Sequence, residues 1–526
     1  MQNQAKNLRA YLKGPSLEIR LKIILSLFFM TLSGGIITAL EAQLNSRAND
    51  IIIIHGADVP GLSGYSIQYL DAADKAPGTY TGEIHAYSYS QAAGWSQIPF
   101  QIEELVAGAY FYESPPDSGL WEIYPPDVLD EDDEIVVDAA DLGEIAPAGS
   151  VPDSSLVTAP CYRIEVTDPL TLEVGSFYLY ANANLTQSFS QDYIANSVVN
   201  CEQCPDQRFE GSIDSDRYAV GFAEGNLSNL VNKIDGSNLD IFDLMFMWVD
   251  LTYPIFGCQV ALPLHLDQGP GNNELVTSAR ILASIDGPVR CVMHLARHTD
   301  IDLLSLNTVT YQIIHFSRNQ VLMPLSLSDF SDVSEYVCSL SFSLRFDFNA
   351  QAMLMNYYDE YNSDTIDGSQ PSEWNYQMPH WRLATGDQTQ GTVVITGSVP
   401  EDLITLGLIQ PLYHDDPSYT DPYGRSTGSD AGHLGCSGFL VPDGIALGNY
   451  IQSYPGVYNV DQRITFLSHA AGNVGAAYQN RHDTPLTINA VDLTPPLPTL
   501  HPVALFVICL LISLIILKTA GRTVKS

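Results

Sequence analysis

Lysine is almost absent from the main part of this 526-residue chain. Between residues 43 and 500 the only lysines are Lys75 and Lys233, and 13 arginines accompany 59 acidic residues, so this segment carries a net charge of −44. Binding to nucleic acid requires clustered lysine and arginine, and docking on anionic lipid requires a basic surface. The first class is therefore excluded and the second disfavoured. The acidity favours solubility in a salty medium over a cation-binding role.

Several catalytic signatures are also missing. The chain contains no Gly-x-Ser-x-Gly elbow, no His-Glu-x-x-His pair and no phosphate-binding loop. Their absence argues against a serine hydrolase, a zinc protease and a nucleotide-driven enzyme. No repeat of fixed period stands out, which argues against a propeller or a solenoid.

Cysteine is scarce. Seven of the eight cysteines lie between residues 43 and 500, and this odd number permits at most three disulfides and leaves one thiol. The disulfide candidates are Cys161, Cys201, Cys204, Cys258, Cys291, Cys338 and Cys436. Cys201 and Cys204 have redox spacing, but no thioredoxin-like strand and helix surround them, so a loop disulfide is favoured. No second close pair indicates a structural zinc site.

The N-terminus has the composition of a secretory signal peptide. Five basic residues within residues 1–22 precede the apolar stretch 23–32, and small residues follow near Ala39 and Ala42. This order of basic, apolar and small residues is typical of such peptides. We therefore expect residues 1–42 to act as a signal peptide that is cleaved after Ala39 or Ala42. An uncleaved N-terminal anchor is the alternative.

The C-terminal tail, residues 494–526, contains a second apolar segment. Residues 500–517 are long enough to cross a bilayer as a transmembrane helix, and Lys518, Arg522 and Lys525 follow them. The positive-inside rule then predicts a cytoplasmic C-terminus. The body of the protein is expected on the outer side of the inner membrane.

The tail resembles the PEP-CTERM and IPTL-CTERM sorting signals of bacteria. The resemblance rests on residues 497–500 (Leu-Pro-Thr-Leu), the apolar helix and the basic end. It implies that a sorting transpeptidase removes the tag and passes the protein to the cell surface. His501 and Pro502 stand where a Glu-Trp pair commonly follows in this class, so a permanent single-pass anchor is the alternative.

The body is predicted to be all-β. Residues 339–348 alternate apolar and polar side chains, which predicts a strand with one buried and one wet face. Shorter runs of this kind are separated by Gly, Pro, Asn and Asp, as in sandwiches and barrels. We expect two β-sandwich-like domains, residues 43–190 and 217–493, joined by a polar linker at 191–216 that contains the close cysteine pair.

Two motifs in the first domain resemble a pattern found in secreted, β-rich bacterial proteins. They are residues 97–104 (Gln-Ile-Pro-Phe-Gln-Ile-Glu-Glu) and 129–138 (Leu-Asp-Glu-Asp-Asp-Glu-Ile-Val-Val-Asp). Those families are mostly uncharacterised, and the resemblance implies no catalytic residue. The acidic turn concentrates hard oxygen ligands, which suit Ca²⁺. The candidate metal ligands are Asp130, Asp132, Asp133 and Glu134, and a purely structural acidic turn is the alternative.

A second ligand cluster lies in a segment rich in glycine, serine and proline. Its candidate metal ligands or acid–base partners are His414, Asp415, Asp416 and His433. Their spacing is not diagnostic, and ordinary surface residues are the alternative.

Aromatic residues near carboxylates form the third candidate site. Trp374, Tyr376, His380 and Trp381 follow two aspartates. Ring faces that stack on sugars are typical of a polysaccharide cleft, whereas a glycosidase needs two acids at a suitable separation. The alternative is that these aromatics belong to the core or its rim.

Residues 217–224 (Arg-Tyr-Ala-Val-Gly-Phe-Ala-Glu) and 285–290 (Ile-Asp-Gly-Pro-Val-Arg) form a fourth candidate, in which Asp-Gly-Pro predicts a turn between strands. An arginine–glutamate pair between these segments across the sandwich would be structural.

These observations favour a non-catalytic, exported protein of the cell surface or extracellular matrix. A carbohydrate-active enzyme, either a lyase or a hydrolase, is the alternative, and a calcium-dependent adhesin is a third hypothesis. No cofactor is required, and Ca²⁺ is the one candidate. The expected partners are the membrane, a sorting transpeptidase and a polysaccharide.

Overall fold

The computed structural model describes much of the chain between residues 44 and 495. The described ranges are 44–67, 82–105, 112–113, 121–122, 128–200, 209–223, 226–233, 239–255, 260–269, 272–273, 276–301, 306–327, 337–418, 433–456, 458–470 and 472–495. They form antiparallel sheets with few helices, so the all-β prediction is confirmed. The predicted signal peptide and the tail from residue 496 onward lie outside these ranges. Within them, no helix is long and apolar enough to cross a bilayer.

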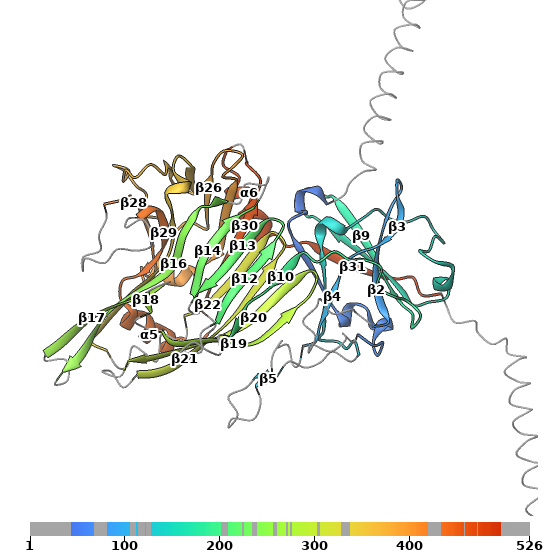
Figure 1. Ribbon diagram of the computed structural model, residues 1–526, viewed down its shortest axis with the longest axis horizontal. Helices are drawn as coiled ribbons and strands as arrows, with labels where there is room; N and C mark the ends of the chain where they lie inside the picture. Colours follow the sequence, from blue (N-terminus) through green and yellow to red (C-terminus); the bar gives the residue numbers. More distant parts are fainter. Residues whose placement is uncertain are drawn as a thin grey trace, which may run out of the picture.

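Two sheets at one end of the molecule share a core, and we call them the N-terminal sheet pair (Figure 1). The first sheet has the order β1 (Ile51–His55), β7 (Glu134–Asp138) and β4 (Gln101–Glu103). The second has the order β3 (Gly94–Gln97), β2 (Ile84–Ser90), β9 (Val174–Ala181), β8 (Cys161–Thr167) and β31 (Thr487–Asp492). Ile52 and Ile135 of the first sheet belong to the same buried cluster as Ile164 and Phe177 of the second.

The last strand of this pair comes from the far end of the chain. β31 pairs antiparallel with β8, and Thr487 lies opposite Thr167 and Asp492 opposite Tyr162. The expected division of the chain differs from the structure here, because residues 487–492 were assigned to the C-terminal domain. Pairing between strands distant in sequence leaves no local periodicity from which it can be predicted.

The other large sheets form what we call the large sheet assembly. One six-stranded sheet comprises β10 (Ile194–Asn196), β12 (Phe209–Ser215), β13 (Tyr218–Ala223), β14 (Asn226–Asn232) and β15 (Leu239–Asp240), with β11 (Val199–Asn200) on β12. The other comprises β18 (Asn272–Asn273), β17 (Val260–Gly269), β16 (Phe242–Ile255), β23 (Ser339–Phe348), β29 (His433–Val441) and β28 (Gln410–Asp416). The nine-stranded sheet comprises β19 (Val276–Asp286), β20 (Arg290–Ile301), β21 (Leu306–Ser317), β22 (Gln320–Ser326), β30 (Asn459–Leu467), β27 (Thr392–Ser398), β26 (Trp381–Thr385), β24 (Asn356–Asp359) and β25 (Ser363–Thr365).

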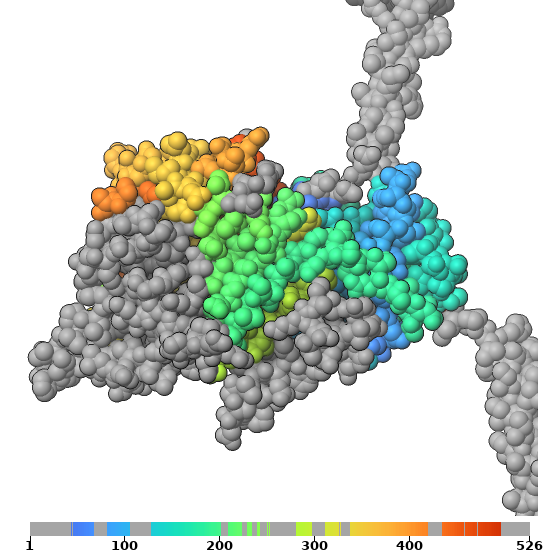
Figure 2. Space-filling model, in the orientation of Figure 1, coloured from blue at the N-terminus to red at the C-terminus, as the bar shows by residue number. Residues whose placement is uncertain are grey.

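Few elements lie outside these sheets. They include the hairpin of β5 (Tyr112–Glu113) and β6 (Trp121–Glu122) and the helices α4 (Glu401–Thr405), α5 (Gly444–Ser453) and α6 (Gly475–Asp483). In the space-filling view the blue and teal N-terminal sheet pair lies at one end of the molecule (Figure 2). The yellow and orange segment around residues 360–410 lies toward the other end.

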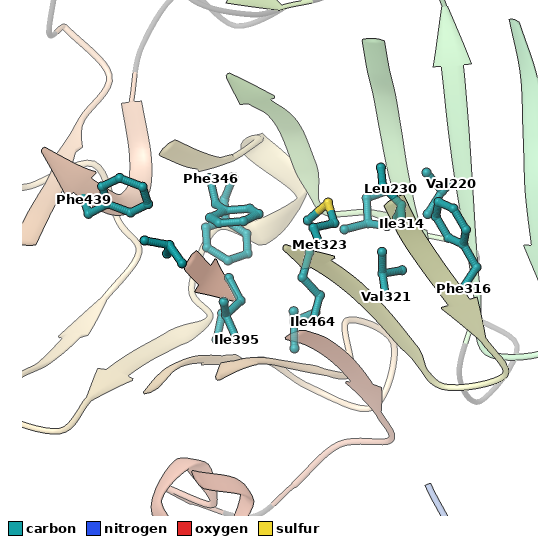
Figure 3. Close-up of a cluster of buried hydrophobic side chains, with 14 of the residues drawn as sticks. Val220, Leu230, Ile314, Phe316, Val321, Met323, Phe346, Ile395, Phe439 and Ile464 are labelled. Carbon is teal, nitrogen blue, oxygen red and sulfur yellow. The ribbon is translucent and has the colours of Figure 1, made fainter. Parts of the chain in front are cut away.

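A shared apolar core joins the layers of the large sheet assembly. Val220 and Leu230, on β13 and β14, lie in one cluster with Phe316, Val321 and Met323 of the nine-stranded sheet (Figure 3). Burial of this apolar surface is the main source of stability for such layered sheets.

The segment predicted as a linker, residues 191–216, contains sheet strands instead. Its described part contributes β10, β11 and β12, and Phe209 and Ile213 are fully buried. Ile194 and Val198 belong to the same core, whereas Val199 is exposed, so the polar composition of this stretch concealed half-buried strands.

Residues 339–348 form the predicted strand, β23. The prediction that its polar face is exposed to solvent is wrong for most of the strand. β23 lies between β16 and β29, and Ser343, Arg345 and Asp347 are as buried as their apolar neighbours. Arg345 donates from Nε to the Ser343 hydroxyl at 2.8 Å, and Asp347 accepts from the Leu434 backbone at 3.1 Å. Buried hydrogen bonds therefore replace solvent on the polar face.

Three of the seven disulfide candidates are not disulfide-bonded. Cys161, Cys291 and Cys436 are buried free thiols, and burial raises the pKa of each thiol. Each lies in a strand of a different sheet, where it packs as a small apolar residue. Cys338 is disulfide-bonded. Cys201, Cys204 and Cys258 lie outside the described residues.

Candidate functional site

The predicted aromatic site separates into packing residues and surface residues. Trp374 stacks on Tyr413 with ring centroids 4.0 Å apart and an interplanar angle of 7°. Trp381 is only 4% exposed and packs with Leu383 and Val394 in a small hydrophobic cluster that is separate from the main core. The two tryptophans therefore stabilise the fold, in agreement with the alternative that such rings belong to the core or its rim.

Tyr376 and His380, by contrast, line one groove of about 480 Å³. Tyr361 and Glu401 lie in the same groove, and the side chains of Tyr361 and Tyr376 are 38% and 64% exposed. The groove lies beside α4, in the yellow and orange part of the molecule (Figure 2). Exposed rings next to polar groups are the usual composition of a small-molecule or sugar site.

A histidine–carboxylate pair lies at the edge of this groove. His380 Nδ1 lies 2.8 Å from the Glu360 carboxylate. Partial burial favours a higher pKa for Glu360, but the hydrogen bonds from His380 outweigh it and hold the pKa of Glu360 below its usual range. Glu360 is therefore an ionised hydrogen-bond acceptor, whereas a glycosidase acid needs a raised pKa.

Glu360 and Tyr361 were not among the predicted site residues. They follow the buried end of β24, and the sequence Asp-Glu-Tyr at 359–361 has the same acid–aromatic pattern that drew attention to residues 374–381. A search for this acid–aromatic pattern before residue 374 would have identified Glu360 and Tyr361.

The histidine–aspartate cluster does not form a common site among the described side chains. His414 and Asp415 are consecutive on β28, where the pairing with β29 is interrupted by an irregularity between His414 and Asp416. Burial lowers the pKa of His414 to about 4, and Arg345 adds to the effect. His414 is therefore neutral at physiological pH. Asp416 accepts from the backbone and hydroxyl of Ser418, and the His433 side chain lies outside the described part.

Asp415 has a structural role. It is fully buried, and its carboxylate accepts backbone N–H bonds from Asp367 and Gly368 at 2.9 Å, from Ser369 at 3.3 Å and from Gly435 at 2.9 Å. A carboxylate that accepts this many N–H bonds has its charge satisfied without a metal. It joins the loop after β25 to the start of β29.

The acidic turn contains a different candidate metal group from the one predicted. Within the described ranges, Glu104, Asp130 and Asp133 each offer an oxygen, and these oxygens all lie within 4.8 Å of one another. Asp133 is buried and accepts from the backbone of Leu105 at 3.2 Å and of Asp130 at 2.8 Å. Burial raises the pKa of Asp133 to about 6 against these hydrogen bonds. Three carboxylate oxygens suit a hard cation such as Ca²⁺.

Of the four residues predicted for this metal site, Asp132 and Glu134 lie outside that group. Glu134 begins β7 and its carboxylate accepts from Nη2 of Arg290 at 2.5 Å. Glu104, the missed ligand, directly follows β4, which pairs with β7. Its position in the first of the two acidic motifs was visible in the sequence, but its proximity to the second depends on that strand pairing.

The two motifs that resemble secreted bacterial proteins meet around Arg290. Its guanidinium donates to the Glu103 carboxylate from Nε at 2.7 Å and from Nη2 at 2.5 Å. Gln101 accepts from the Arg290 backbone at 3.1 Å and donates to Glu103 at 2.6 Å. Burial raises the pKa of Glu103, with Arg290 opposing the shift. The network joins the N-terminal sheet pair to β20 and is structural. Its glutamates come from β4 and β7, whereas Glu224, the glutamate of the segment considered in the sequence, lies outside the described residues.

No family model matches the chain. No curated protein matches it either.

Proposed function

We propose that this chain is an exported, non-catalytic protein of the bacterial cell surface or extracellular matrix that binds a polysaccharide. The site is the groove lined by Tyr361, Tyr376 and His380. The predicted signal peptide and sorting tail supply the location in this proposal. They hold the body outside the inner membrane until a transpeptidase releases it.

The two exposed tyrosine rings in one groove carry the binding proposal. Tyr376 is 64% exposed, although burial of such a ring would contribute on the order of 2 kcal/mol. Gln377, Gln410 and Glu401 surround the rings with hydrogen-bonding groups. A sugar chain satisfies both kinds of contact, because it presents apolar ring faces and hydroxyl edges.

The carboxylate at this groove favours binding over catalysis. Glu360 is held ionised by His380, so it accepts hydrogen bonds from hydroxyl groups and does not supply a proton. The chain that forms the groove carries a net charge of −38, which repels anionic ligands. We therefore expect neutral polysaccharides to bind in preference to anionic ones.

Affinity electrophoresis of the full chain against neutral and anionic polysaccharides tests this function. Tyr376→Ala should weaken binding to the preferred polymer about tenfold, which corresponds to about 1.4 kcal/mol. Tyr454→Ala is the matched control, since Tyr454 is 61% exposed and is not among the residues that line the groove. Equal loss in both variants, or no loss in Tyr376→Ala, would contradict the proposal.

The same preparation tests the enzymatic alternative. Cleavage of a bound polysaccharide that disappears in Glu360→Gln would replace the binding role with a carbohydrate-active enzyme. Mass analysis of the protein from cells tests the location, because sorting predicts a C-terminus before Val503 and a permanent anchor predicts an intact tail.

A further inference from the structure

A second cavity, of about 540 Å³, lies between the N-terminal sheet pair and the nine-stranded sheet. β1 and β31 form one side, and β21, β22 and β30 form the other, with α6 at its end. β1 and β31 are edge strands of their sheets. We call this cavity the interface cleft, and it is separate from the groove at Tyr376.

Positive charge is concentrated in the interface cleft. Arg47, Arg290, Arg463 and Arg481 line it, which is four of the chain's 16 arginines. Asp50 is the one carboxylate among its lining residues. The chain as a whole has 61 acidic and 23 basic residues, whereas basic side chains outnumber acidic ones in this cleft.

Two of these arginines are already neutralised by carboxylates. Arg47 contacts Asp50 and Asp168, each at 3.1 Å. Arg290 contacts Glu103 and Glu134, as described above. Their charges are therefore compensated within the protein and are not available to a ligand.

Arg463 and Arg481 differ from them. Neither makes an ion pair within the described part of the chain, and Arg481 instead lies over the ring of Tyr478, 4.5 Å from its centroid. Burial lowers the pKa of Arg463, with the charges of Asp50 and Asp461 opposing the shift. A guanidinium withdrawn from water without a hydrogen-bonded counter-charge is energetically costly.

Unsatisfied polar atoms lie among the same cleft-lining residues as these two arginines. Nδ1 of His482, another residue of the cleft, is buried without a hydrogen-bond partner in the described structure, and so is Nε of Arg47, whose side chain is almost completely buried. Burial lowers the pKa of His482, so its ring is a neutral donor or acceptor. Native structures rarely leave such atoms unpaired unless a water, ion or ligand completes them.

We propose that the interface cleft binds an organic anion through Arg463 and Arg481. Guanidinium groups bind carboxylate and phosphate oxygens with two parallel hydrogen bonds, which gives both charge and orientation. Apolar side chains of β1, β22 and β31, among them Ile51, Leu322 and Ile488, form the remaining wall. The ligand is therefore an anion with an apolar part, such as a medium-chain carboxylate. Its anionic group lies at the arginines and its carbon chain lies along this wall.

Thermal unfolding of the full chain tests the site with defined probes. Sodium hexanoate, acetate and phosphate are compared with sodium chloride at equal ionic strength, so that screening of the acidic surface is the same in all samples. A ligand that binds only the folded state raises the melting temperature as its concentration increases. We expect hexanoate to raise it more than acetate, and both to exceed chloride.

Substitutions locate the effect. Arg481→Gln should weaken hexanoate binding at least tenfold, and it keeps the backbone carbonyl of residue 481, which accepts from Arg47 at 3.0 Å. Arg463→Gln should have the same effect and provides an independent variant. Arg163→Gln is the control, because Arg163 pairs with Glu165 on β8 and is not among the cleft-lining residues.

Equal shifts with hexanoate and chloride would overturn the proposal, and so would unchanged binding in both arginine variants. A phosphate shift with no advantage of hexanoate over acetate would overturn the assignment to an organic anion. Hexanoate binding that is lost in Arg481→Gln or Arg463→Gln and kept in Arg163→Gln supports it.

Discussion

Buried carboxylates in this protein act mainly as hydrogen-bond acceptors for the fold. Asp415 receives backbone N–H groups from the loop after β25 and from the start of β29, and Glu103 receives the Arg290 guanidinium. Asp415 was part of the histidine–aspartate cluster that suggested metal or acid–base chemistry. An acid that appears functional in sequence becomes structural when the fold supplies it with enough donors.

Asp138 is an exception, and it allows a prediction about pH. Its carboxyl is 1% exposed, Oδ1 accepts from the Ala140 backbone at 2.8 Å, and Oδ2 is buried without a hydrogen-bond partner among the described residues. Burial raises its pKa to about 7, and the charge of Asp141 adds to the effect. The protonated acid is therefore the form that the folded state accommodates.

The direction of the pH effect follows from this raised pKa. The contribution of Asp138 is fully present below the unfolded-state pKa of 3.8 and is lost as the pH rises through about 7. Asp138→Asn keeps the Oδ1 acceptor and removes the charge. It should raise the free energy of unfolding at pH 8 by up to about 4 kcal/mol and change it little at pH 4. Urea denaturation at the two pH values measures this, and an equal effect at both would refute it.

At the scale of elements, β31 joins the C-terminal part of the chain to the N-terminal sheets. It adds the fifth strand to the sheet of β8, and Ile488 and Ala490 pack against the core of the N-terminal sheet pair. Arg47 reinforces the connection, since it donates to the backbone carbonyls of Arg481 at 3.0 Å and Thr484 at 2.7 Å. The folded N-terminal sheets therefore depend on a strand that is synthesised long after their other strands.

This dependence predicts that a charge on β31 destabilises the distant N-terminal sheets. Ile488→Asp should lower the free energy of unfolding by about 2 kcal/mol or more, because it removes apolar burial and places a carboxylate against the core. It should also increase amide exchange in β8. Thr487→Asp is the control, since Thr487 is exposed on the same strand. Unchanged exchange in β8 would show that β31 does not stabilise its partner.

At the scale of the whole molecule, net charge is the dominant electrostatic property. A charge of −38 implies repulsion among surface acids at low ionic strength. Sodium chloride should therefore raise the melting temperature between about 0.01 and 0.2 M, as the screening length falls to below about 10 Å. A melting temperature that falls over this range would contradict the expectation.

A comparison of Ca²⁺ with Na⁺ distinguishes general charge screening from binding at a specific site. At matched ionic strength, Ca²⁺ should raise the melting temperature further than sodium, because Glu104, Asp130 and Asp133 bring three carboxylate oxygens together. Asp130→Asn should remove only this additional rise, and a chelator should reverse it. Asp153→Asn is the control, because Asp153 lies outside this group.

The difference between local and distant information explains which expectations held. Alternation over residues 339–348 located β23 because strand periodicity is a local property. It did not show that Ser343, Arg345 and Asp347 are buried, because that depends on β16, β29 and the layers packed around them. The composition at 191–216 suggested a linker for the same reason, since four core residues, Ile194, Val198, Phe209 and Ile213, among many polar ones are a weak signal.

The sequence by itself determined the all-β class and the strong acidity, since both are set by side-chain composition and short-range pattern. Only the tertiary structure decided which residues meet. Strand pairing placed Glu104 beside Asp133, turned Glu134 toward Arg290 and brought β31 to β8. The packing of α6 and β30 also placed Arg481 and Arg463 in one cleft. Such contacts join segments far apart in the chain, and their energies arise only when the sheets pack.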